Sequence, residues 1–378
     1  MKYFKIKDLR ISRLGYGCMR FPIVDGDNGR IDKEKAEPLL LHAIEQGVKY
    51  IDMAYTYHEK TSEAFVGEVL KAHNIRDKVN LATKMPCWLV KEPEDFQKIL
   101  DQQLKNLKTD YIDFYLLHSL DFKTYRKMED LGVLKFLDEI KEKGIVKHVG
   151  FSFHDEYVAF VEILESYNWD FCQIQLNYID TDYQAGLKGY KLAEEKQIPV
   201  VIMEPLKGGR LSNPPEEVVE LKNQVAKDSP SMLALKYPLS LKNVMTVLSG
   251  MNTKDQIDEN IETASTVEPG KLTAEEKNFY QKAKAVYKKR ERIGCTGCEY
   301  CMPCTVKINI PKVFSLWNKA YLYDEETESK KAYQAYLKDG ITPEKCIECK
   351  KCERECPQNL KIVEGLKQAF KIKQQRGH

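Results

Sequence analysis

The 378-residue sequence predicts an α/β protein in which a parallel (β/α)8 TIM barrel is followed by a small α-helical domain. Two observations support this fold class. Eight short apolar runs alternate with amphipathic segments over residues 11–265, and eight of the eleven cysteines lie beyond residue 290. A near-continuous apolar run is typical of a strand buried on both faces, and eight such strands, each followed by a helix, form a closed parallel barrel.

Each predicted strand rests on its own apolar run. The well-spaced runs start roughly 30 to 35 residues apart, and each precedes a segment with a 3.6-residue apolar period, such as residues 93–107. An open, doubly wound sheet is the alternative, but no G-x-G-x-x-G sequence opens the first helix, and the count of eight favours closure. In chain order the runs are RLGYGCM, KYIDMA, VNLATK, YIDFYLLH, VKHVGFS, FCQIQLN, IPVVIME and NVMTVLS.

The chain is expected to divide into three segments. Residues 1–270 form the barrel, residues 271–290 form a basic linker helix, and residues 291–378 form the cysteine-rich domain. The stretch between the two cysteine groups, residues 311–340, is polar, aromatic and helix-prone, so the small domain is predicted to be mainly helical.

Composition excludes several classes of function. The formal net charge is +2, from 59 basic and 57 acidic residues, and gives no reason to expect a nucleic-acid or anionic membrane partner. No apolar run approaches the roughly 18 residues of a spanning helix, and the first residues lack the apolar region of a signal peptide. We therefore expect a cytoplasmic protein with reduced thiols, in which Cys18, Cys87 and Cys172 are small core residues.

Four polar residues follow three neighbouring predicted strands. Asp52 and Tyr57 end the second, Lys84 the third and His118 the fourth, and the carboxyl ends of barrel strands meet at one mouth. A lysine ammonium beside a phenol lowers its pKa from about 10, and a carboxylate keeps the lysine charged. Together these groups predict a site in which Tyr57 protonates an oxygen while His118 orients a carbonyl.

These residues lie in motifs that resemble the aldo-keto reductase family. The resemblance spans residues 8–265 and implies a carbonyl reductase with a catalytic tetrad of Asp52, Tyr57, Lys84 and His118. It also implies a small-molecule carbonyl substrate and hydride transfer from a nicotinamide cofactor bound in extended form, without a Rossmann domain. The motifs are LGYGCMR, IDMAYTYHEK, ATKMP, YLLHSL, GFSFHD, QIQLNYID, EPLKGGRL and SGMNTKDQIDEN.

The resemblance further implies a set of cofactor-contacting residues. Ser152 and Gln173 match positions that hold the carboxamide, and Met203 stands where the family has an aromatic residue stacked on the ring. The remaining positions are the pyrophosphate loop Pro205, Leu206, Lys207, Gly208, Gly209 and Arg210, and at the adenosine end Ser249, Gly250, Gln256, Glu259 and Asn260.

Two departures concern the identity of the cofactor. Many NADP-dependent members carry Lys and Arg, which pair with the 2′-phosphate, where this chain has Gly250 and Gln256. Lys254 could compensate for them. Phe153 also stands where many members have asparagine. The cofactor is therefore NADP or NAD, and the sequence does not decide between them.

The C-terminal cysteines form two groups, C-x2-C-x2-C-x2-C and C-x2-C-x2-C-x3-C-P. In a reducing compartment such groups indicate metal ligands, and the second group matches the bacterial ferredoxin pattern. Two 4Fe–4S clusters are predicted, with one cluster or a zinc site held by four cysteines as alternatives. The eight candidate ligands are Cys295, Cys298, Cys301, Cys304, Cys346, Cys349, Cys352 and Cys356.

This region resembles the α-helical ferredoxin type. The resemblance implies that Cys295, Cys298, Cys301 and Cys356 hold one cluster and that Cys346, Cys349, Cys352 and Cys304 hold the other. The first group departs from the pattern because Thr305 stands where a proline would follow.

Three functions remain open from the sequence. The first is a reductase whose clusters exchange electrons with a partner protein, which would usually need a flavin because a hydride carries two electrons and a cluster passes one. The sequence has no flavin fingerprint. The second is a reductase with structural clusters, and the third is a nicotinamide-binding redox sensor or docking protein. Met19 and Trp88 are expected to line an apolar wall of the substrate pocket, and the substrate is not identified.

Overall fold

The computed structural model describes residues 1–6, 9–295, 297, 301–323, 327, 331, 332, 334–336, 342–356 and 359–371. The chain forms two compact units. The first comprises Met1–Ser212 and Asp228–Thr273, and the second comprises Asn213–Lys227 and Ala274–His378. The domain limits expected from the sequence remain predictions.

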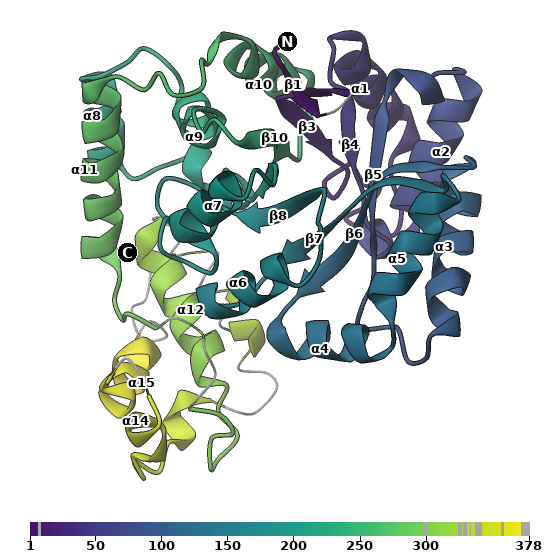
Figure 1. Ribbon diagram of the computed structural model, residues 1–378. Coiled ribbons are helices and arrows are strands. Elements are labelled where there is room, and N and C mark those ends of the chain that lie inside the picture. The colour runs from purple at the N-terminus through teal and green to yellow at the C-terminus, as the bar shows by residue number, and fades with distance from the viewer. Residues whose placement is uncertain are drawn as a thin grey trace. The chain divides into compact units, whose positions relative to one another are not determined.

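Eight parallel strands of the first unit close into a barrel (Figure 1). The order around the barrel is β10-β3-β4-β5-β6-β7-β8-β9, and each strand overlaps one of the eight predicted apolar runs. The predicted (β/α)8 fold is therefore confirmed. The strands are β3 (Leu14–Gly17), β4 (Tyr50–Asp52), β5 (Asn80–Met85), β6 (Ile112–Leu120), β7 (Val146–Phe153), β8 (Phe171–Gln175), β9 (Val200–Met203) and β10 (Val244–Ser249).

Amphipathic helices surround these strands (Figure 1). In α3, Phe96, Leu100 and Leu107 recur at helical spacing and are buried, and Lys108 ends the helix in a left-handed conformation. The helices of this unit are α1 (Lys33–Glu45), α2 (Ser62–Ala72), α3 (Glu94–Leu107), α4 (Phe122–Asp130), α5 (Val133–Glu142), α6 (Tyr157–Glu165), α7 (Gly186–Glu195), α9 (Pro230–Leu239) and α10 (Lys254–Thr266). Three short 3-10 segments are η1 (Tyr57–Lys60), η2 (Arg76–Lys78) and η3 (Lys207–Ser212).

Helices α2 and α3 approach each other closely at Gly67. A Cβ atom on Gly67 would lie 2.4 Å from the carbonyl oxygen of Asn106 and 2.6 Å from the carbonyl carbon of Leu107. Backbone atoms cannot swing away as a flexible side chain can, so this contact requires glycine.

An N-terminal hairpin packs against the barrel interior. Strands β1 (Tyr3–Ile6) and β2 (Leu9–Ser12) pair antiparallel, and their Ile6 and Ile11 join an apolar cluster that includes Tyr50, Phe114 and Phe171. The hairpin directly precedes β3, so it covers the amino-terminal end of the barrel and leaves the carboxyl end for the site.

The second unit is mainly helical, as predicted. Its core contains Ile308, Phe314, Trp317 and Leu366. The Arg290 guanidinium pairs at 2.6 Å with Glu217 and so links the last turn of α11 to the first turn of α8. The elements are α8 (Glu216–Asn223), α11 (Ala274–Arg290), α12 (Ile310–Leu322), η4 (Pro343–Lys345), α14 (Lys351–Arg354) and α15 (Ile362–Lys371).

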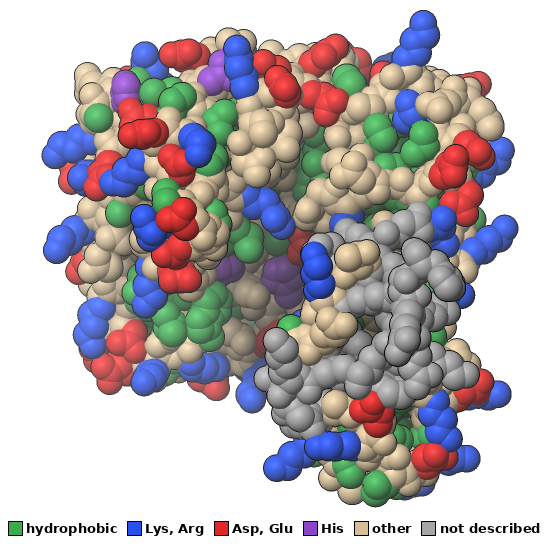
Figure 2. Space-filling view, turned by 180° about the vertical axis from the view of Figure 1, so that it is seen from behind, with side chains coloured by type: hydrophobic (Ala, Val, Ile, Leu, Met, Phe, Trp, Pro, Cys, Tyr) green, Lys and Arg blue, Asp and Glu red, His purple; other side chains and the backbone are tan. Residues whose placement is uncertain are grey.

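The surface carries charges of both signs. Figure 2 shows Lys and Arg side chains interspersed with Asp and Glu over the face that it presents, as the net charge of +2 suggests. Within the part of the chain that the structure describes, no helix has both the length and the apolar character needed to cross a bilayer.

Candidate functional site

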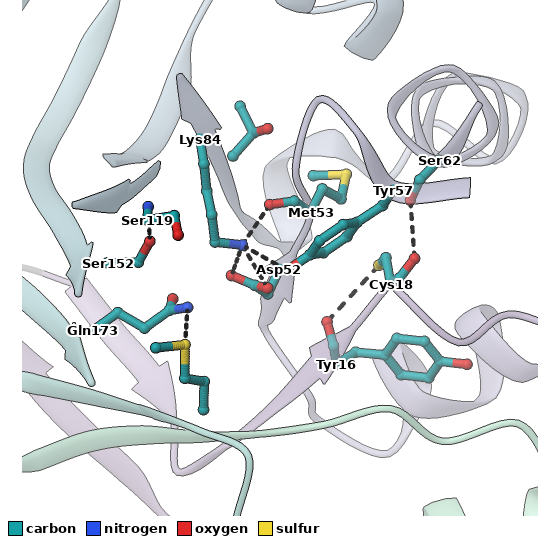
Figure 3. A network of polar contacts seen from close by, with 12 residues as sticks. Tyr16, Cys18, Asp52, Met53, Tyr57, Ser62, Lys84, Ser119, Ser152 and Gln173 are labelled. Atoms are coloured by element: carbon teal, nitrogen blue, oxygen red, sulfur yellow. Dashed lines mark hydrogen bonds and ion pairs between the residues drawn. The ribbon is translucent and has the colours of Figure 1, made fainter. Parts of the chain in front are cut away.

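The four predicted catalytic side chains come from the carboxyl ends of adjacent strands, and Figure 3 shows three of them, Asp52, Tyr57 and Lys84. Asp52 is the last residue of β4, Lys84 lies near the end of β5, and His118 lies near the end of β6. Tyr57 begins η1, five residues after β4. The barrel register therefore brings together residues that are up to 66 positions apart in sequence.

Lys84 is at the centre of this group. Its Nζ donates to both carboxylate oxygens of Asp52, at 2.9 and 2.8 Å, and to the Met53 carbonyl oxygen at 2.7 Å. It lies 3.4 Å from the Tyr57 hydroxyl (Figure 3). Lys84 is fully buried and Asp52 nearly so. Burial is the largest single effect and lowers the pKa of Lys84, but the charges and hydrogen bonds of Asp52 and Tyr57 together outweigh it. The net pKa is therefore raised and the ammonium stays charged.

The phenol of Tyr57 has a raised pKa, whereas the sequence argument anticipated a lowered one. Burial disfavours the phenolate, and this effect is larger than the opposing effect of the Lys84 ammonium. Tyr57 therefore carries its proton at neutral pH. Lys84 opposes the effect of burial without reversing it.

His118 is a neutral imidazole. Burial, followed by the charge of Lys84 and then by His154, lowers its pKa to about 3. Its ring lies edge-on to Tyr57, with 6.4 Å between ring centroids, and 5.1 Å from the Trp88 ring. Its buried Nδ1 has no hydrogen-bond partner among the described residues. A neutral imidazole beside the phenol can donate one hydrogen bond to an oxygen without contributing charge.

A left-handed turn follows Tyr57. His58, Glu59 and Lys60 have φ values of 49°, 52° and 77°, a conformation that non-glycine residues adopt at a cost. Two hydrogen bonds fix this turn. The Phe21 N–H donates to Nε2 of buried His58 at 3.1 Å, and Nδ1 of His58 contacts the Asn28 carbonyl oxygen at 3.0 Å. The sequence analysis missed His58, although it directly follows the proposed proton donor.

Three candidate cofactor residues lie on adjacent strands. Ser152 and Gln173 are paired between β7 and β8, and the Gln173 Nε2 lies 3.4 Å from the Met203 sulfur on β9. The Ser119 N–H donates to the Ser152 hydroxyl oxygen at 2.7 Å. Within the described chain, the buried Oε1 of Gln173 has no partner, so it can accept a hydrogen bond from a carboxamide. This unsatisfied oxygen fits a bound nicotinamide.

The loop after β9 is compact and irregular. Gly208 and Gly209 have φ values of 70° and 96°, and the Gly209 N–H donates to the Leu206 carbonyl at 2.9 Å. The Lys207 amine contacts the Asp180 carboxylate at 2.5 Å. Of the other loop residues named from the sequence, Pro205 is buried and Arg210 is half-buried.

The adenosine-end candidates lie on β10 and the start of α10. Ser249 accepts a hydrogen bond from Asn260 Nδ2 at 3.0 Å, and both residues are buried. The Gln256 Oε1 accepts from the Asn252 N–H at 2.9 Å, so this side chain stabilises the start of the helix. Glu259 is half-buried on the same helix.

Arg20 is a residue that the sequence analysis missed. A Cβ atom on Gly250 would lie 2.9 to 3.1 Å from the Arg20 side chain, and one on Gly208 would lie 3.1 Å from Nη2 of Arg20. The Arg20 side chain therefore lies beside both candidate cofactor loops, with its aliphatic part at Gly250 and its guanidinium at Gly208. Its position in the LGYGCMR motif, directly after the first barrel strand, was the available signal.

The cysteines of the second unit partly cluster. Burial, with the neighbouring Cys346, Glu353 and Cys304, raises the pKa of the Cys352 thiol to about 11, and the Thr305 hydroxyl lies 3.6 Å from the Cys349 sulfur. The end of the first cysteine group thus lies beside the second group. This donor set fits a cluster held across the two groups.

The other ligand set is less fully described. Cys298 lies outside the described residues, whereas Cys295, Cys301 and Cys356 pack at the edge of the second unit's core. Among the described residues, no group of three or more His, Cys, Asp or Glu side chains is already arranged to hold a metal ion. Cys18, Cys87 and Cys172 are free thiols buried in the barrel unit, as predicted.

Comparison with known proteins identifies the family. The family model described as the Aldo/keto reductase family matches residues 13–273. The chain belongs to the aldo/keto reductase family. In this aldo/keto reductase, residues 294–361 match a second model, the 4Fe-4S dicluster domain. Both predicted resemblances are confirmed.

Several relatives of this aldo/keto reductase are known. An uncharacterized oxidoreductase, YqkF, from Bacillus subtilis (strain 168) is 28% identical over 300 residues, which cover 71% of this chain and 91% of YqkF. L-galactose dehydrogenase from Arabidopsis thaliana is 25% identical over 69% of this chain and 86% of its own length. These relatives support an oxidoreductase.

Solved structures share the fold. The holo form of aldo-keto reductase AKR11C1 from Bacillus halodurans is 28% identical, with a TM-score of 0.62, and the match covers 75% of this chain and 96% of that one. An aldo-keto reductase from Klebsiella pneumoniae in complex with NADPH is 17% identical, with a TM-score of 0.59, over 74% and 94% of the two chains.

Proposed function

We propose that the protein reduces an aldehyde or ketone with hydride from NADPH or NADH, with Tyr57 as the proton donor, and exchanges single electrons through C-terminal 4Fe–4S clusters. The contact of one buried ammonium, Lys84, with both Asp52 and Tyr57 carries this proposal. A buried ion pair directly beneath a neutral phenol is costly to maintain as a purely structural feature.

The proposed chemistry follows from the ionisation of the four side chains. A bound nicotinamide would supply hydride to the carbonyl carbon. His118 donates a hydrogen bond to the carbonyl oxygen and holds it near the Tyr57 hydroxyl. Tyr57 then gives its proton to that oxygen as negative charge develops there, and Lys84 stabilises the phenolate that remains. Asp52 keeps Lys84 charged and in place.

The cofactor would lie across the barrel mouth. Ser152 and the unsatisfied Oε1 of Gln173 would hold the carboxamide, with the Met203 thioether against the ring. Arg20, beside Gly208 and Gly250, would supply a cation for the phosphates in place of those that other members carry at residues 250 and 256. Both NADPH and NADH therefore remain candidates.

The clusters would supply one-electron transfer to a partner protein. The contact of Thr305 with Cys349 supports ligation of one cluster by Cys304 together with the second cysteine group. An anaerobic paramagnetic-resonance spectrum, taken before and after nicotinamide is added, tests this coupling. Because a hydride carries two electrons and a cluster passes one, clusters that become reduced indicate a connection through a one-electron mediator such as a flavin, and clusters that do not respond favour the structural role.

Replacing Tyr57 with phenylalanine tests the reductase. We expect Tyr57→Phe to lose at least a hundredfold in turnover with a panel of aldehydes and ketones, because it removes the proton donor, while binding of NADPH or NADH is kept. Tyr55→Phe is the matched control, since Tyr55 is outside the group of four. Full turnover in Tyr57→Phe would refute the assignment.

A further inference from the structure

The loop after β9 adopts a conformation that its sequence does not favour. Glu204 and Lys207 have φ values of 54° and 46°, and Gly208 and Gly209 have 70° and 96°. Glycine adopts such values freely, but glutamate and lysine do not. Contacts from outside the loop must therefore hold Glu204 and Lys207 in this shape.

Two buried amides at the end of β8 and just after it, Gln175 and Asn177, supply those contacts. Asn177 is fully buried, and its Nδ2 donates to the Glu204 carbonyl oxygen at 3.3 Å and to Oδ2 of Asp180 at 3.0 Å. Its Oδ1 accepts from the N–H groups of Ile179 and Asp180 at 3.0 and 2.9 Å. Gln175, also buried, donates to the same Oδ2 of Asp180 at 2.8 Å. The Asp180 carboxylate is thus fixed relative to β8.

Lys207 is attached to this fixed carboxylate. Its Nζ donates to Oδ2 of Asp180 at 2.5 Å, and the side chains are only 25% and 16% exposed. A half-buried ion pair is less screened than a surface pair, and here it also receives support from two amides. The charge of Lys207 is therefore largely satisfied within the protein, although the resemblance placed Lys207 in the pyrophosphate loop.

We propose that Asp180 is a positioning residue that holds the loop of residues 204–210 in its cofactor-binding shape through Lys207. On this assignment Lys207 fastens the loop and does not bind a phosphate of the cofactor. The inference rests on the proposed function, because it concerns the same nicotinamide site. The inference adds Asp180, which lies outside the predicted cofactor contacts, and gives Lys207 a positioning role in place of a contact with the cofactor.

The two roles for Lys207 predict opposite effects of Asp180→Asn. If Asp180 positions the loop, removing its charge releases Lys207 and weakens cofactor binding. If Lys207 binds phosphate, the same substitution frees its charge and leaves binding unchanged or tighter. The probes are NADPH and NADH, and the measurement is the Kd from fluorescence titration at two salt concentrations.

We expect Asp180→Asn and Lys207→Met each to raise the Kd by about tenfold, and the double variant to be no worse than either single one, because both remove one interaction. Lys207→Arg should bind close to the wild-type level. The KM for the cofactor should rise in Asp180→Asn, while kcat at saturating cofactor stays near that of the wild type. Asp182→Asn, which removes the same charge two residues away, is the matched control.

Each other outcome is decisive. Unchanged or tighter binding in Asp180→Asn overturns the inference, and so do additive effects of the two substitutions. If Asp180→Asn does not fold, as judged by circular dichroism, the Kd values of Lys207→Met and Lys207→Arg at the two salt concentrations distinguish the two roles of Lys207. A loss that grows with falling salt would mark Lys207 as a phosphate ligand and overturn the inference. Wild-type protein that binds neither cofactor overturns the proposed function and the inference with it.

Discussion

At the scale of single residues, the ion pair of Lys84 and Asp52 dominates the site. Each charge is buried, so each depends on the other to remain ionised, and the Tyr57 phenol lies directly against the pair. Removing one partner leaves an uncompensated buried charge. Removing both leaves none.

We therefore expect Lys84→Met to lower the free energy of unfolding by about 3–5 kcal/mol, because Asp52 then remains buried without a partner. The double variant Asp52→Leu with Lys84→Met should recover most of this loss while remaining inactive. Urea unfolding at pH 7 and carbonyl turnover measure the two properties. Equal destabilisation in the single and double variants would contradict the account.

The lowered pKa of His118 predicts a dependence of stability on pH. Between the ordinary histidine pKa of about 6.5 and the folded-state value of about 3, the unfolded chain takes up a proton at this position and the folded chain does not. The free energy of unfolding therefore falls as the pH falls below 6.5, by at most about 1.4 kcal/mol per pH unit.

His118→Gln removes this contribution. When the pH falls from 7 to 5, the free energy of unfolding should decrease by about 1–2 kcal/mol less in the variant than in the wild type. Urea unfolding curves at pH 7, 6 and 5 give this difference. Parallel pH profiles for the two proteins would mean that His118 titrates normally when folded.

At the scale of elements, packing overrides helix propensity at Gly67. Alanine stabilises an average helix interior by about 1 kcal/mol relative to glycine. At this position, however, a Cβ would lie 2.4 Å from the Asn106 carbonyl oxygen, so α2 and α3 would have to move apart.

We expect Gly67→Ala to lower the free energy of unfolding by about 1–3 kcal/mol despite its better helix propensity. Thermal and urea unfolding measure the change. Lys71→Ala, on the exposed side of the same helix, controls for propensity and should be neutral or slightly stabilising. A stabilised Gly67→Ala would show that the two helices can separate without cost.

The barrel could be predicted from the sequence because each strand has its own apolar run, and the polar residues after three of those runs meet at one mouth for geometric reasons. The catalytic and cofactor roles of the site residues remain predictions. Contacts between loops distant in sequence were not foreseen. His58 contacts residues 21 and 28, and Lys207 contacts Asp180. The periodicity of apolar residues in the sequence does not predict such pairs, because they depend on the register of the folded barrel.

The ionisation of Tyr57 illustrates the same limit. The sequence identified an ammonium near the phenol, which lowers its pKa. It did not reveal how deeply the phenol is buried, and burial has the larger effect. The amount of burial is a property of the whole packed unit, so the net direction required the structure.

At the scale of the whole molecule, the second unit combines a modest apolar core with cysteines. Cys352 is buried among Phe314, Trp317 and Leu366, and other cysteines pack at the edge of this core. Bound metal should therefore contribute to the folding of this unit.

Extracting the metal with a chelator under oxidising conditions should lower the midpoint temperature of the second unit's unfolding transition or abolish the transition. The reason is that the thiolates then lose the metal that they bind together. Calorimetry and circular dichroism measure the transition, and metal analysis before extraction distinguishes iron from zinc. An unchanged thermogram after complete metal loss would show that the apolar core is sufficient.

The second unit is assembled from two separate stretches of the chain, and this affects how it folds during synthesis on the ribosome. Helix α8 is complete by Asn223, but α11, to which Arg290 and Glu217 link it, begins only at Ala274, about fifty residues later. At about 5–20 residues per second, synthesis of the intervening stretch takes roughly 3–10 s. During those seconds α11 does not yet exist to pair with α8, while β10, the last strand of the barrel, is translated.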